Sequence, residues 1–410
     1  MTGKYRHLKE KLLQLLQHFP VVAILGARQT GKTTLSRQTV PEWKYFDFEN
    51  PQDFELITRD MSFFFSQYPQ AVILDEVQSS PEIFSVLRGV IDANRAQKGR
   101  FLLTGSSSPE LVKHLSETLA GRIAYVELGT MKMTELFNQP LSIFYEIFSH
   151  KLSTTLPMSG VSPLSRMQLQ SAWLKGGYPE PNLDDNAFFF QQWMENYRES
   201  YVYRDLGRWF PRLNKIAYRR FLTTLGNISG TILTKSDLAR DIEVSEPTIK
   251  EYLSIVEGTY FWRSLPSFET NVRKAVVKMP RGHIRDSGLL HFLLKISDID
   301  QLLSHQAVGR SFESFVIEEI FKGLHATSVT NWQGYYYRTR HGAEIDLILE
   351  GPFGLLPIEI KSGLFTPTKQ LHVMQEFLED HQLPLGILIN QSTEIQWLTS
   401  KIVQIPATWL

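Results

Sequence analysis

The chain has 410 residues, a length typical of two to three domains at about 150 residues each. Hydrophobic residues make up 42% and charged residues 21%, ordinary globular values that exclude disorder, collagen-like repeats and coiled coil as the dominant state. The 43 Lys and Arg balance the 43 Asp and Glu, so no net charge attracts the whole molecule to nucleic acid or to an anionic membrane.

The sequence contains no cysteine, which excludes disulfides, a thiol nucleophile and cysteine-ligated zinc and favours a reducing compartment. Residues 1–19 are typical of an amphipathic helix, because charges at Lys9, Glu10 and Lys11 interrupt the apolar core that a signal peptide needs. The longest apolar runs are far shorter than the ~20 residues that span a bilayer. We therefore expect a cytoplasmic protein with no membrane partner.

Short apolar runs alternate with helical stretches between residues 20 and 130. The runs are continuous rather than alternating with polar residues, as in a parallel sheet that helices cover on both faces. We expect an α/β nucleotide-binding architecture here. The expected strands are VVAIL at 21–25, KYFDF at 44–48, AVILDEV at 71–77, RFLLTGS at 100–106 and AYVEL at 124–128.

The segment after the first run fits the phosphate-loop pattern G-x-x-x-x-G-K-[ST], and it stands between an apolar strand and a helix, as the pattern requires. Gly26 and Gly31 permit backbone conformations in which NH groups point at phosphate oxygens, and the following helix adds its positive end. Lys32 would contact the β- and γ-phosphates of ATP, and Thr33 would supply a hydroxyl to Mg²⁺. The expected nucleotide-binding residues are Gly26, Ala27, Arg28, Gln29, Thr30, Gly31, Lys32, Thr33 and Thr34.

The run AVILDEV ends in two carboxylates, Asp75 and Glu76. In a fold with a phosphate loop, the first acid holds the Mg²⁺ shell and the second polarises the attacking water. We therefore expect Asp75 to be a metal ligand together with Thr33, and Glu76 to act in catalysis.

Two further features are candidates for parts of the same site. Residues 104–108 are polar and follow an apolar strand, where an AAA-type ATPase keeps a side chain that reads the γ-phosphate; a Ser-rich loop without that role is the alternative. Arg122, acting in its own chain or from a neighbouring subunit, and Arg28 are candidates for an arginine that stabilises charge during hydrolysis. Most arginines are solvated surface residues, and that interpretation stays open for both.

The run LGARQTGKTT, followed in order by VILDEVQ, LLTGSSS and LAGR, resembles the AAA-superfamily ATPases of bacteria and archaea that carry a C-terminal domain of unknown function. The similarity continues at LKGGYPE, GRSFESFV and EIDLIL, so it covers nearly the whole chain. The resemblance implies ATP binding and hydrolysis by an AAA or STAND-like core.

The segment TKSDLARDIEVSEPTIKEYLSIVEG predicts two short helices joined by a turn. Ser245 is a suitable N-cap for the second helix, Pro247 fits its first turn, and Gly258 is a suitable end. A strand follows, which together with the helices is typical of a winged helix. The residues expected to pack the two helices together are Leu238, Ile242, Val244, Ile249 and Leu253.

Charge makes nucleic acid a candidate partner of this region. Residues 201–290 contain 15 Lys and Arg against nine Asp and Glu, as binding to a phosphate backbone requires. Glu246 and Glu251 on the expected recognition helix would repel phosphates, so a packing module is an equal alternative. The basic residues on or after the expected wing are Arg273, Lys274, Lys278, Arg281 and Arg285.

The segment GAEIDLILEGPFGLLPIEIKSG predicts a hairpin whose loop is 351–354. Paired residue numbers then sum to 705, so that Asp346 faces Glu359 and Glu344 faces Lys361 on one face of the pair. The other face carries Ile345, Leu347, Leu349, Ile358 and Ile360. Two facing carboxylates repel each other unless a divalent metal such as Mg²⁺ or Mn²⁺ lies between them. Glu313, on the apolar stripe of a preceding helix, is the candidate third ligand.

Glu313, Asp346 and the tripeptide Glu359-Ile360-Lys361 resemble the PD-(D/E)XK nucleases, particularly archaeal Holliday-junction resolvases. The resemblance implies a metal site with Lys361 as a catalytic residue, over about the last hundred residues. The alternative is a surface hairpin with ordinary cross-strand ion pairs, and the fold can persist where the chemistry has been lost. Arg338, Arg340 and His341 are candidates for contact with a phosphate backbone or, equally, members of a solvated edge.

The leading hypothesis is a P-loop ATPase whose nucleotide state controls a winged-helix and nuclease-like module acting on DNA. The alternative is an ATP-dependent regulatory switch that binds a protein or nucleic-acid partner, or a second copy of itself, and cuts nothing. The expected domains are the AAA-like ATPase at 1–135, a helical connecting region at 136–230, the winged helix at 231–300 and a restriction-endonuclease-like α/β domain at 301–410.

Overall fold

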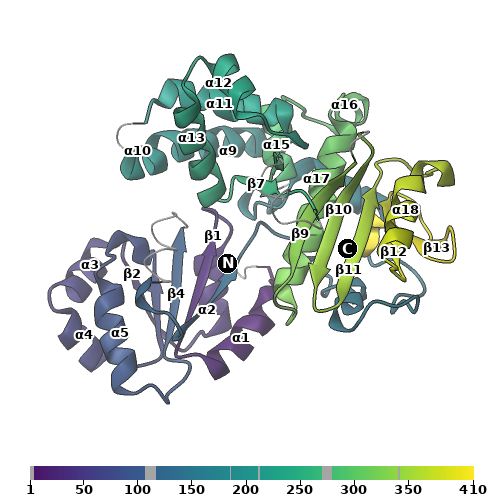
Figure 1. Ribbon diagram of the computed structural model, residues 1–410. Coiled ribbons are helices and arrows are strands. Elements are labelled where there is room, and N and C mark those ends of the chain that lie inside the picture. Colours follow the sequence, from purple (N-terminus) through teal and green to yellow (C-terminus); the bar gives the residue numbers. More distant parts are fainter. Residues whose placement is uncertain (1–3, 107–116, 185, 211–212, 270–278, 340–341) are drawn as a thin grey trace. The chain divides into compact units, whose positions relative to one another are not determined.

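The computed structural model describes residues 4–106, 117–184, 186–210, 213–269, 279–339 and 342–410 (Figure 1). The chain forms two compact units. Unit 1 comprises residues 1–131, 255–261 and 325–327, and unit 2 comprises the remaining residues.

Unit 1 is built on a five-stranded sheet in the order β2-β3-β4-β1-β5, and every neighbouring pair is parallel. All five expected strands are present, with ends shifted by one or two residues, so the predicted α/β architecture is confirmed. The strands are β1 (Val21–Gly26), β2 (Lys44–Asp47), β3 (Val72–Asp75), β4 (Phe101–Ser106) and β5 (Ile123–Glu127).

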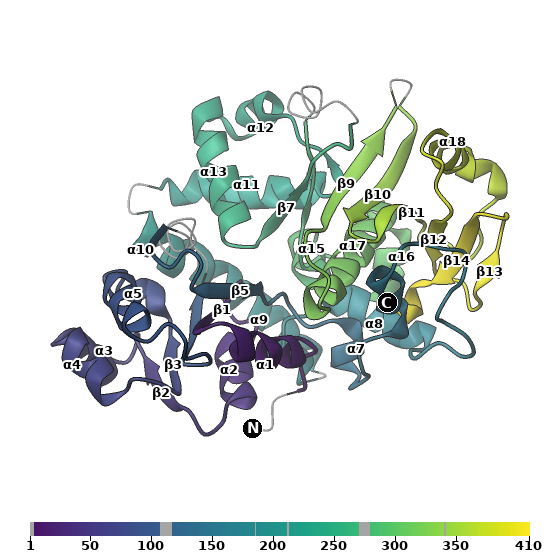
Figure 2. The same ribbon diagram turned by 60° about the horizontal axis from the view of Figure 1, so that its bottom comes forward.

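Helices cover both faces of this sheet (Figures 1 and 2). Val21, Ala23 and Leu25 of β1 pack in one apolar cluster with α3, α4 and α5, whereas Val22 and Ile24 pack in another with α1 and α2. Successive side chains of a strand point to opposite faces, so a strand that is apolar at every position needs helices on both sides. The helices are α1 (Leu8–His18), α2 (Lys32–Thr39), α3 (Pro51–Thr58), α4 (Met61–Gln67) and α5 (Ile83–Ala93).

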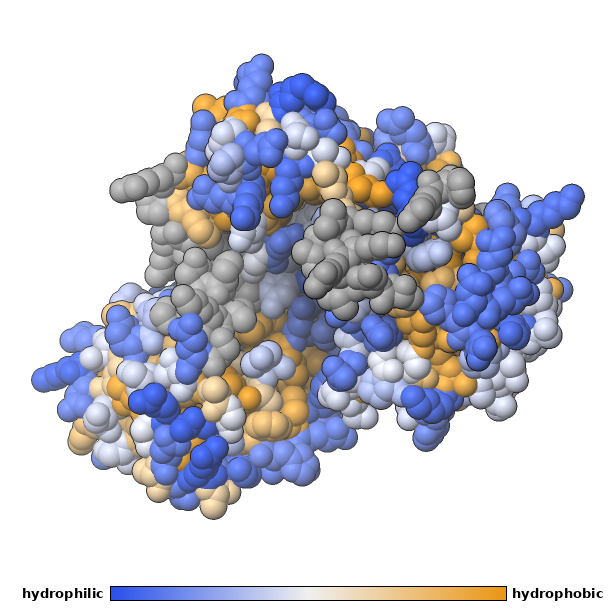
Figure 3. Space-filling model, in the orientation of Figure 1, coloured by the Kyte–Doolittle hydropathy of each residue, from blue (hydrophilic) through white to orange (hydrophobic). Residues whose placement is uncertain are grey.

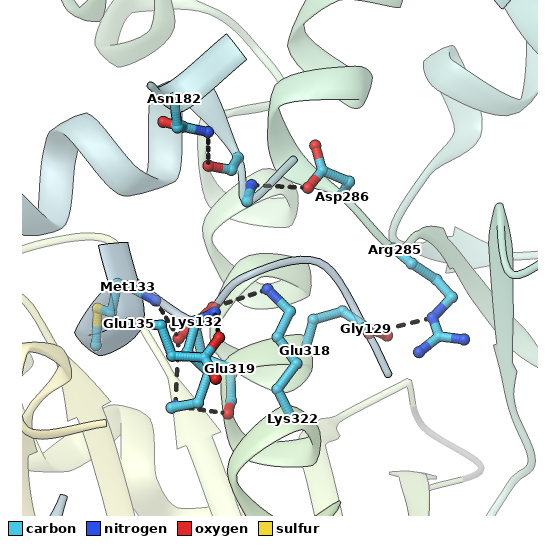
Figure 4. Close-up of polar contacts among 12 residues, drawn as sticks. Gly129, Lys132, Met133, Glu135, Asn182, Arg285, Asp286, Glu318, Glu319 and Lys322 are labelled. Atoms are coloured by element: carbon cyan, nitrogen blue, oxygen red, sulfur yellow. Dashed lines mark hydrogen bonds and ion pairs between the residues drawn. The ribbon is translucent and has the colours of Figure 1, made fainter. Parts of the chain in front are cut away.

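Unit 2 begins with a largely helical region, as the sequence predicts. Its first residue, Lys132, is buried and donates hydrogen bonds to the main-chain and side-chain oxygens of Glu319 at 3.0 and 3.3 Å (Figure 4). Lys132 also donates to the Tyr145 hydroxyl at 2.7 Å. The buried ion pair with Glu319 fixes the start of unit 2 to the long helix α17 (Val308–Ala326). The helices up to residue 228 are α7 (Met133–Leu136), α8 (Arg166–Lys175), α9 (Ala187–Ser200), α10 (Leu206–Trp209) and α11 (Lys215–Ile228).

A three-stranded antiparallel sheet in the order β6-β8-β7 follows in unit 2. The Ser245 hydroxyl accepts a hydrogen bond from the Thr248 NH at 3.3 Å, which confirms the predicted N-cap of α13. Four of the five apolar residues expected to pack the two helices are buried, and Val244 is half-buried. The elements are β6 (Thr231–Ile232), α12 (Lys235–Ile242), α13 (Glu246–Gly258), β7 (Trp262–Leu265) and β8 (Arg281–Ile284).

The C-terminal part of unit 2 is a six-stranded mixed sheet in the order β13-β14-β12-β11-β10-β9. The helix α18 packs on one of its faces, in a cluster with Ile345, Ile348 and Leu388. The strands are β9 (Gln333–Arg338), β10 (Glu344–Gly351), β11 (Gly354–Ile360), β12 (Gly386–Asn390), β13 (Gln396–Trp397) and β14 (Ile402–Pro406). The helices are α15 (Ser287–Leu293), α16 (Ile299–Ser304), α17 (Val308–Ala326) and α18 (His372–Asp380).

The hairpin of β10 and β11 keeps the predicted register, with Glu350 opposite Leu355 and Leu347 opposite Ile358. The strands pair as far as Gly351 and Gly354, so the loop has two residues rather than four.

The same register ends before the expected carboxylate pair. Regular pairing stops one position short of Asp346 and Glu359, and the register of β10 against β9 shifts between Ile345 and Ile348. Ile345 and Ile348, three residues apart, therefore pack in the same apolar cluster. The prediction of a strict two-residue alternation is wrong at this point, because a β-bulge turns the strand.

Hydrophilic side chains cover most of the molecular face drawn in Figure 3. Among the residues that the structure describes, no helix has both the length and the apolar composition needed to cross a membrane.

Candidate nucleotide-binding site and carboxylate cluster

The predicted phosphate loop connects β1 to α2 in unit 1. Gly31 has φ 91° and directly precedes the first helical residue, and Gln29 also has a positive φ of 59°. A Cβ on Gly26 would lie 2.2 Å from the Leu128 carbonyl oxygen, so only glycine fits where the loop leaves the strand. Both glycines of the motif are therefore required by the backbone, one for its conformation and one for a close approach.

The Lys32 side chain folds back into the loop. It is 4% exposed, and its ammonium donates to the carbonyl oxygens of Ala27 at 2.8 Å and Gly26 at 3.2 Å. Burial lowers the pKa of Lys32, and the nearby carboxylates Glu76 and Asp75 act in the opposite direction. The loop thus holds a cation at the position where a phosphate would bring negative charge.

A buried arginine that the sequence did not single out supports the loop. Arg6 donates from Nη1 to the Thr30 carbonyl oxygen at 2.7 Å and from Nη2 to the Gly129 carbonyl oxygen at 2.8 Å. Thr30 in turn donates its hydroxyl to the Ala27 carbonyl at 2.9 Å. Nothing in the local sequence marks Arg6, because its partners lie far away along the chain.

Asp75, at the end of β3, accepts hydrogen bonds from three hydroxyl groups. Its Oδ2 accepts from Thr33 at 2.7 Å and from Tyr45 at 2.7 Å, and its Oδ1 accepts from Thr104. Thr33 and Asp75, both expected as metal ligands, lie within hydrogen-bonding distance of each other and offer the oxygen ligands that Mg²⁺ prefers. These residues therefore fit a magnesium ion beside the phosphate loop.

Tyr45 is the partner of Asp75 that sequence reasoning missed. Burial and the hydrogen bond to Asp75 both raise the pKa of Tyr45, so its hydroxyl stays a neutral donor. Tyr45 belongs to β2, the strand next to β3, and Arg37 lies over its ring at 4.7 Å. The phosphate-loop motif gives no signal for Tyr45, because the sequence of β2 predicts a strand but carries no functional motif.

The other predicted residues of this region have the following positions. Glu76 follows Asp75 with a positive φ of 55° and accepts a hydrogen bond from the Gln78 side chain, and its NH donates to the Thr104 hydroxyl at 3.4 Å. Arg28 is half-buried within the loop, and Thr34 is exposed. Of the polar segment 104–108, Thr104 reaches Asp75, whereas residues 107 and 108 lie outside the described residues.

Arg122 lies at the opposite edge of the sheet. It precedes Ile123, which pairs with Val21 at the start of β1, whereas the phosphate loop begins after the end of β1. Its guanidinium donates to both carboxylate oxygens of Asp92 at 2.7 and 2.8 Å. This position corrects the expectation that Arg122 acts on nucleotide in its own chain.

Three carboxylates of unit 2 that the sequence selected do come together. We call Glu313, Asp346 and Glu359, with the cations Arg281 and Lys361, the carboxylate cluster. Arg281 donates to Asp346 Oδ1 at 3.2 Å and to Glu313 Oε2, and Lys361 lies 3.6 Å from Asp346 Oδ2 and donates to Glu359. Asp346 Oδ2 also accepts from the Ile360 NH at 2.9 Å.

Burial dominates the electrostatics of the carboxylate cluster. Burial and the neighbouring Asp346 raise the pKa of Glu313 to about 7 and that of Glu359 to about 8. Burial lowers the pKa of Lys361, but Asp346 and Glu359 outweigh it and raise the value overall. Three acids face two cations, so protonation offsets the remaining negative charge near neutral pH.

Glu344 does not join the carboxylate cluster as an ion-pair partner of Lys361. It pairs instead with Arg338 across β9 and β10, at 3.1 Å. This contact corrects the expected pairing and makes Glu344 part of the ordinary surface of the hairpin. Arg340 and His341 lie outside the described residues.

Glu318, another buried acid on α17, pairs with basic side chains in and next to the three-stranded sheet. Glu318 is 2% exposed and pairs with Arg263 of β7, His283 of β8 and Arg285. Burial raises the pKa of Glu318, but Arg263 and Arg285 outweigh it and hold the value well below its usual range.

These ion pairs change the prediction for the basic residues of the wing. Arg281 and Arg285 point into the protein and pair with acids, with side-chain exposures of 8% and 10%, so they do not present a surface to a phosphate backbone. Arg273, Lys274 and Lys278 lie outside the described residues.

In the part of the chain that the structure describes, no group of three or more His, Asp or Glu has the arrangement of a metal site. For Glu313, Asp346 and Glu359 the physical reason is visible, because Arg281 and Lys361 already occupy their carboxylate oxygens. The residues of the carboxylate cluster, as they stand here, do not fit a divalent ion.

Three family models match successive parts of the chain. An AAA domain matches residues 18–137, a domain of unknown function (DUF8612) matches residues 166–300, and a second domain of unknown function (DUF4143) matches residues 308–410. Two uncharacterized proteins, one from Mycobacterium bovis and one from Mycobacterium tuberculosis, are each 31% identical over 414 residues. The alignment covers 99% of this chain and 84% of each relative.

Solved structures give weaker similarities. A Walker-type ATPase of Pyrococcus abyssi is 14% identical with a TM-score of 0.40, and the match covers 71% of this chain and 98% of that one. The RuvB Holliday junction branch migration motor of Thermotoga maritima is 16% identical with a TM-score of 0.32, covering 63% of this chain and 89% of that one. Because both TM-scores are below 0.5, we infer nothing from these two structures.

Proposed function

We propose that this chain, which belongs to the same family as the two mycobacterial proteins, binds ATP and hydrolyses it with Mg²⁺. Residues 18–137 carry an AAA-type P-loop domain. The observation that carries the proposal is the arrangement of Lys32 inside the phosphate loop with Thr33 hydrogen-bonded to Asp75 at its edge.

Lys32 and the loop backbone would bind the phosphates. The ammonium exchanges its hydrogen bonds to the Gly26 and Ala27 carbonyls for β- and γ-phosphate oxygens, and the loop NH groups and the start of α2 add further positive potential. Because Lys32 is buried, its charge acts in a medium that screens it less than water does.

Thr33 and Asp75 would hold Mg²⁺, which neutralises charge on the β- and γ-phosphates when it is bound. Thr33 would offer its hydroxyl oxygen to the ion and Asp75 its carboxylate, and hydrogen bonds from Tyr45 and Thr104 keep that carboxylate oriented. Glu76, directly after Asp75, is the base that would orient water at the γ-phosphate, and its NH contact with Thr104 connects it to the strand β4.

The test compares Lys32→Ala with Lys44→Ala. Lys44 is an exposed lysine at the start of β2, at the sheet edge away from the loop, so its loss should leave nucleotide binding intact. We expect the Lys32 variant to lose binding of a fluorescent ATP analogue and release of phosphate. Equal turnover by wild type and Lys32→Ala would refute the site assignment.

For the remainder of unit 2 we propose a winged helix and a nuclease-like fold. The element order α11-β6-α12-α13-β7-β8 with the sheet order β6-β8-β7 supports the former. The order α17-β9-β10-β11-α18-β12, with Glu313, Asp346 and Glu359 brought together, supports the latter.

One observation favours a regulatory switch over a DNA nuclease. Arg281 and Arg285, two of the residues expected to contact DNA, are paired with acids inside the protein, and the exposed side of α13 presents Glu246 and Glu251. Acids at that position repel phosphates. We therefore propose that the cytoplasmic ATPase transmits its nucleotide state to a protein partner or a second copy of itself through unit 2, without cutting DNA.

Cleavage of plasmid and branched DNA separates the two functions. The assay uses Mg²⁺ or Mn²⁺, with and without ATP, on wild type, Asp346→Ala and Lys32→Ala. We expect no cleavage by any of them while wild type hydrolyses ATP. Cleavage by wild type that disappears in Asp346→Ala would establish the nuclease, and loss in Lys32→Ala would show that ATP controls it.

A further inference from the structure

The carboxylate cluster contains an arginine that comes from a different structural element than any of its acids. Arg281 is the first residue of β8 in the three-stranded sheet, whereas Glu313 belongs to α17 and Asp346 to β10 of the six-stranded sheet. Its Nη2 donates to Glu313 and its Nη1 to Asp346, and its Nε donates to the Gly230 carbonyl oxygen at 2.9 Å. Every nitrogen of the guanidinium therefore has an acceptor inside the protein.

We propose that Arg281 is a built-in cation that takes the position of a divalent metal among Glu313, Asp346 and Glu359 and excludes metal from the carboxylate cluster. A guanidinium and a divalent ion satisfy the same need, because each brings positive charge and several directed contacts to carboxylates from separate elements. The two are mutually exclusive here, since the Arg281 side chain fills the space between Glu313 and Asp346.

The second cation completes the arrangement. Lys361 pairs with Glu359 and lies 3.6 Å from the Asp346 oxygen that Arg281 does not contact. Asp346 is thus held from both sides, and its Oδ2 also accepts the Ile360 NH. A metal would have to displace a protein cation at each carboxylate, which is costly because the displaced guanidinium would remain buried without its partners.

Removing Arg281 should reverse this preference. Three buried acids would then face the single charge of Lys361, an uncompensated arrangement that a divalent cation relieves. Exclusion of metal from the carboxylate cluster would therefore depend on the Arg281 side chain supplied by the three-stranded sheet. The proposal is independent of ATP hydrolysis, because every residue it uses belongs to unit 2.

The experiment counts Mn²⁺ bound to the full chain by electron paramagnetic resonance, without nucleotide. All proteins carry Asp75→Asn, which removes the expected ion ligand at the phosphate loop. The test variant is Arg281→Met, and Arg263→Met is the matched control, because it also removes a buried arginine of the same sheet that pairs with an acid of α17. Glu318, the acid left behind in the control, keeps its contacts with His283 and Arg285.

We expect Arg281→Met to gain roughly one Mn²⁺ per chain, to lose it again when Asp346→Asn is added, and the starting protein and the Arg263 variant to bind none. A folded Arg281→Met that binds no Mn²⁺ would overturn the proposal. Arg281→Gln, which keeps hydrogen bonding and removes the charge, serves if the methionine variant does not fold.

The starting protein, which carries only Asp75→Asn, provides a second and independent measurement. If it binds Mn²⁺ and Asp346→Asn abolishes that binding, Arg281 does not exclude metal and the proposal is wrong. If the melting temperature of the starting protein is unchanged by Mn²⁺ while that of Arg281→Gln rises, the proposal is supported. Neither reading depends on whether the phosphate loop turns over ATP.

Discussion

Asp75 in unit 1 and Asp346 in unit 2 are both buried acids at the end or bend of a strand, yet they have different partners. Asp75 accepts from the neutral hydroxyls of Thr33, Tyr45 and Thr104, whereas Asp346 pairs with the cations Arg281 and Lys361. Hydroxyls rotate and accept or donate as needed, so they leave the negative charge of Asp75 available to a metal. Fixed cations neutralise that charge, so the same side chain can attract or exclude metal according to its neighbours.

The largest expected difference between the two acids is their effect on ATP turnover. Asp75→Asn should reduce ATP turnover on the order of 100-fold or more, because it removes a ligand that acts on charge at the transferring phosphate. Asp346→Asn should leave turnover unchanged, since its described partners Arg281, Ile360 and Lys361 all belong to unit 2. Steady-state phosphate release measures both, and a large loss in Asp346→Asn would contradict the separation of the two sites.

The second prediction concerns the contribution of a buried ion-pair group to the free energy of unfolding. Glu318→Gln leaves Arg263, His283 and Arg285 without their shared acid, so we expect it to lower the free energy of unfolding by about 3–5 kcal/mol. Glu344→Gln, which removes the half-exposed pair with Arg338, should cost only about 0–1 kcal/mol. Urea denaturation distinguishes them, and similar losses for both would refute the assigned difference.

A third prediction uses the acids of the carboxylate cluster. The pKa values of Glu313, about 7, and Glu359, about 8, exceed the ordinary value of 4.5, so the folded chain binds more protons than the unfolded chain between these limits. Stability is therefore lost as pH rises from about 4.5 to 8. In Glu359→Gln, the free energy of unfolding should fall over this pH range by less than in wild type, by on the order of 1 kcal/mol or more. Denaturation between pH 5 and 8.5 measures it, and parallel curves for the two proteins would contradict it.

The smallest effect is expected at Tyr45. Tyr45→Phe deletes one of the three hydroxyls on Asp75, so the metal-free protein should lose about 1 kcal/mol of stability. The Mg²⁺ concentration for half-maximal turnover should rise, because the carboxylate loses a hydrogen bond that keeps it oriented. Tyr125→Phe, on the exposed surface of β5, is the matched control. If the Mg²⁺ requirement of Tyr45→Phe falls instead, the hydroxyl competes with the metal for Asp75 rather than supporting its binding.

Local patterns predicted much of this molecule. Apolar runs identified the five strands of unit 1, a Ser before a helix identified the N-cap at Ser245, and a short Gly-containing loop fixed the hairpin register. Each of these depends on residues close together in sequence, where spacing and propensity carry the information.

The features of the two sites that the sequence did not predict depend on contacts between distant segments of the chain. Tyr45 reaches Asp75 and Arg6 reaches Thr30 across more than twenty residues, and no motif marks either. The sequence predicted the convergence of Glu313, Asp346 and Glu359 but not the arginine between them, because a positive residue on a wing is equally suited to DNA and to a buried acid. The bulge at Asp346 was missed because alternation assumes an unbroken strand.

The most direct test of this account is the number of Mn²⁺ ions that the wild-type chain binds with a non-hydrolysable ATP analogue. We predict one ion per chain, lost in Asp75→Asn and retained in Asp346→Asn. A second ion that only Asp346→Asn removes would contradict the account, because the carboxylate cluster would then bind metal in the presence of Arg281.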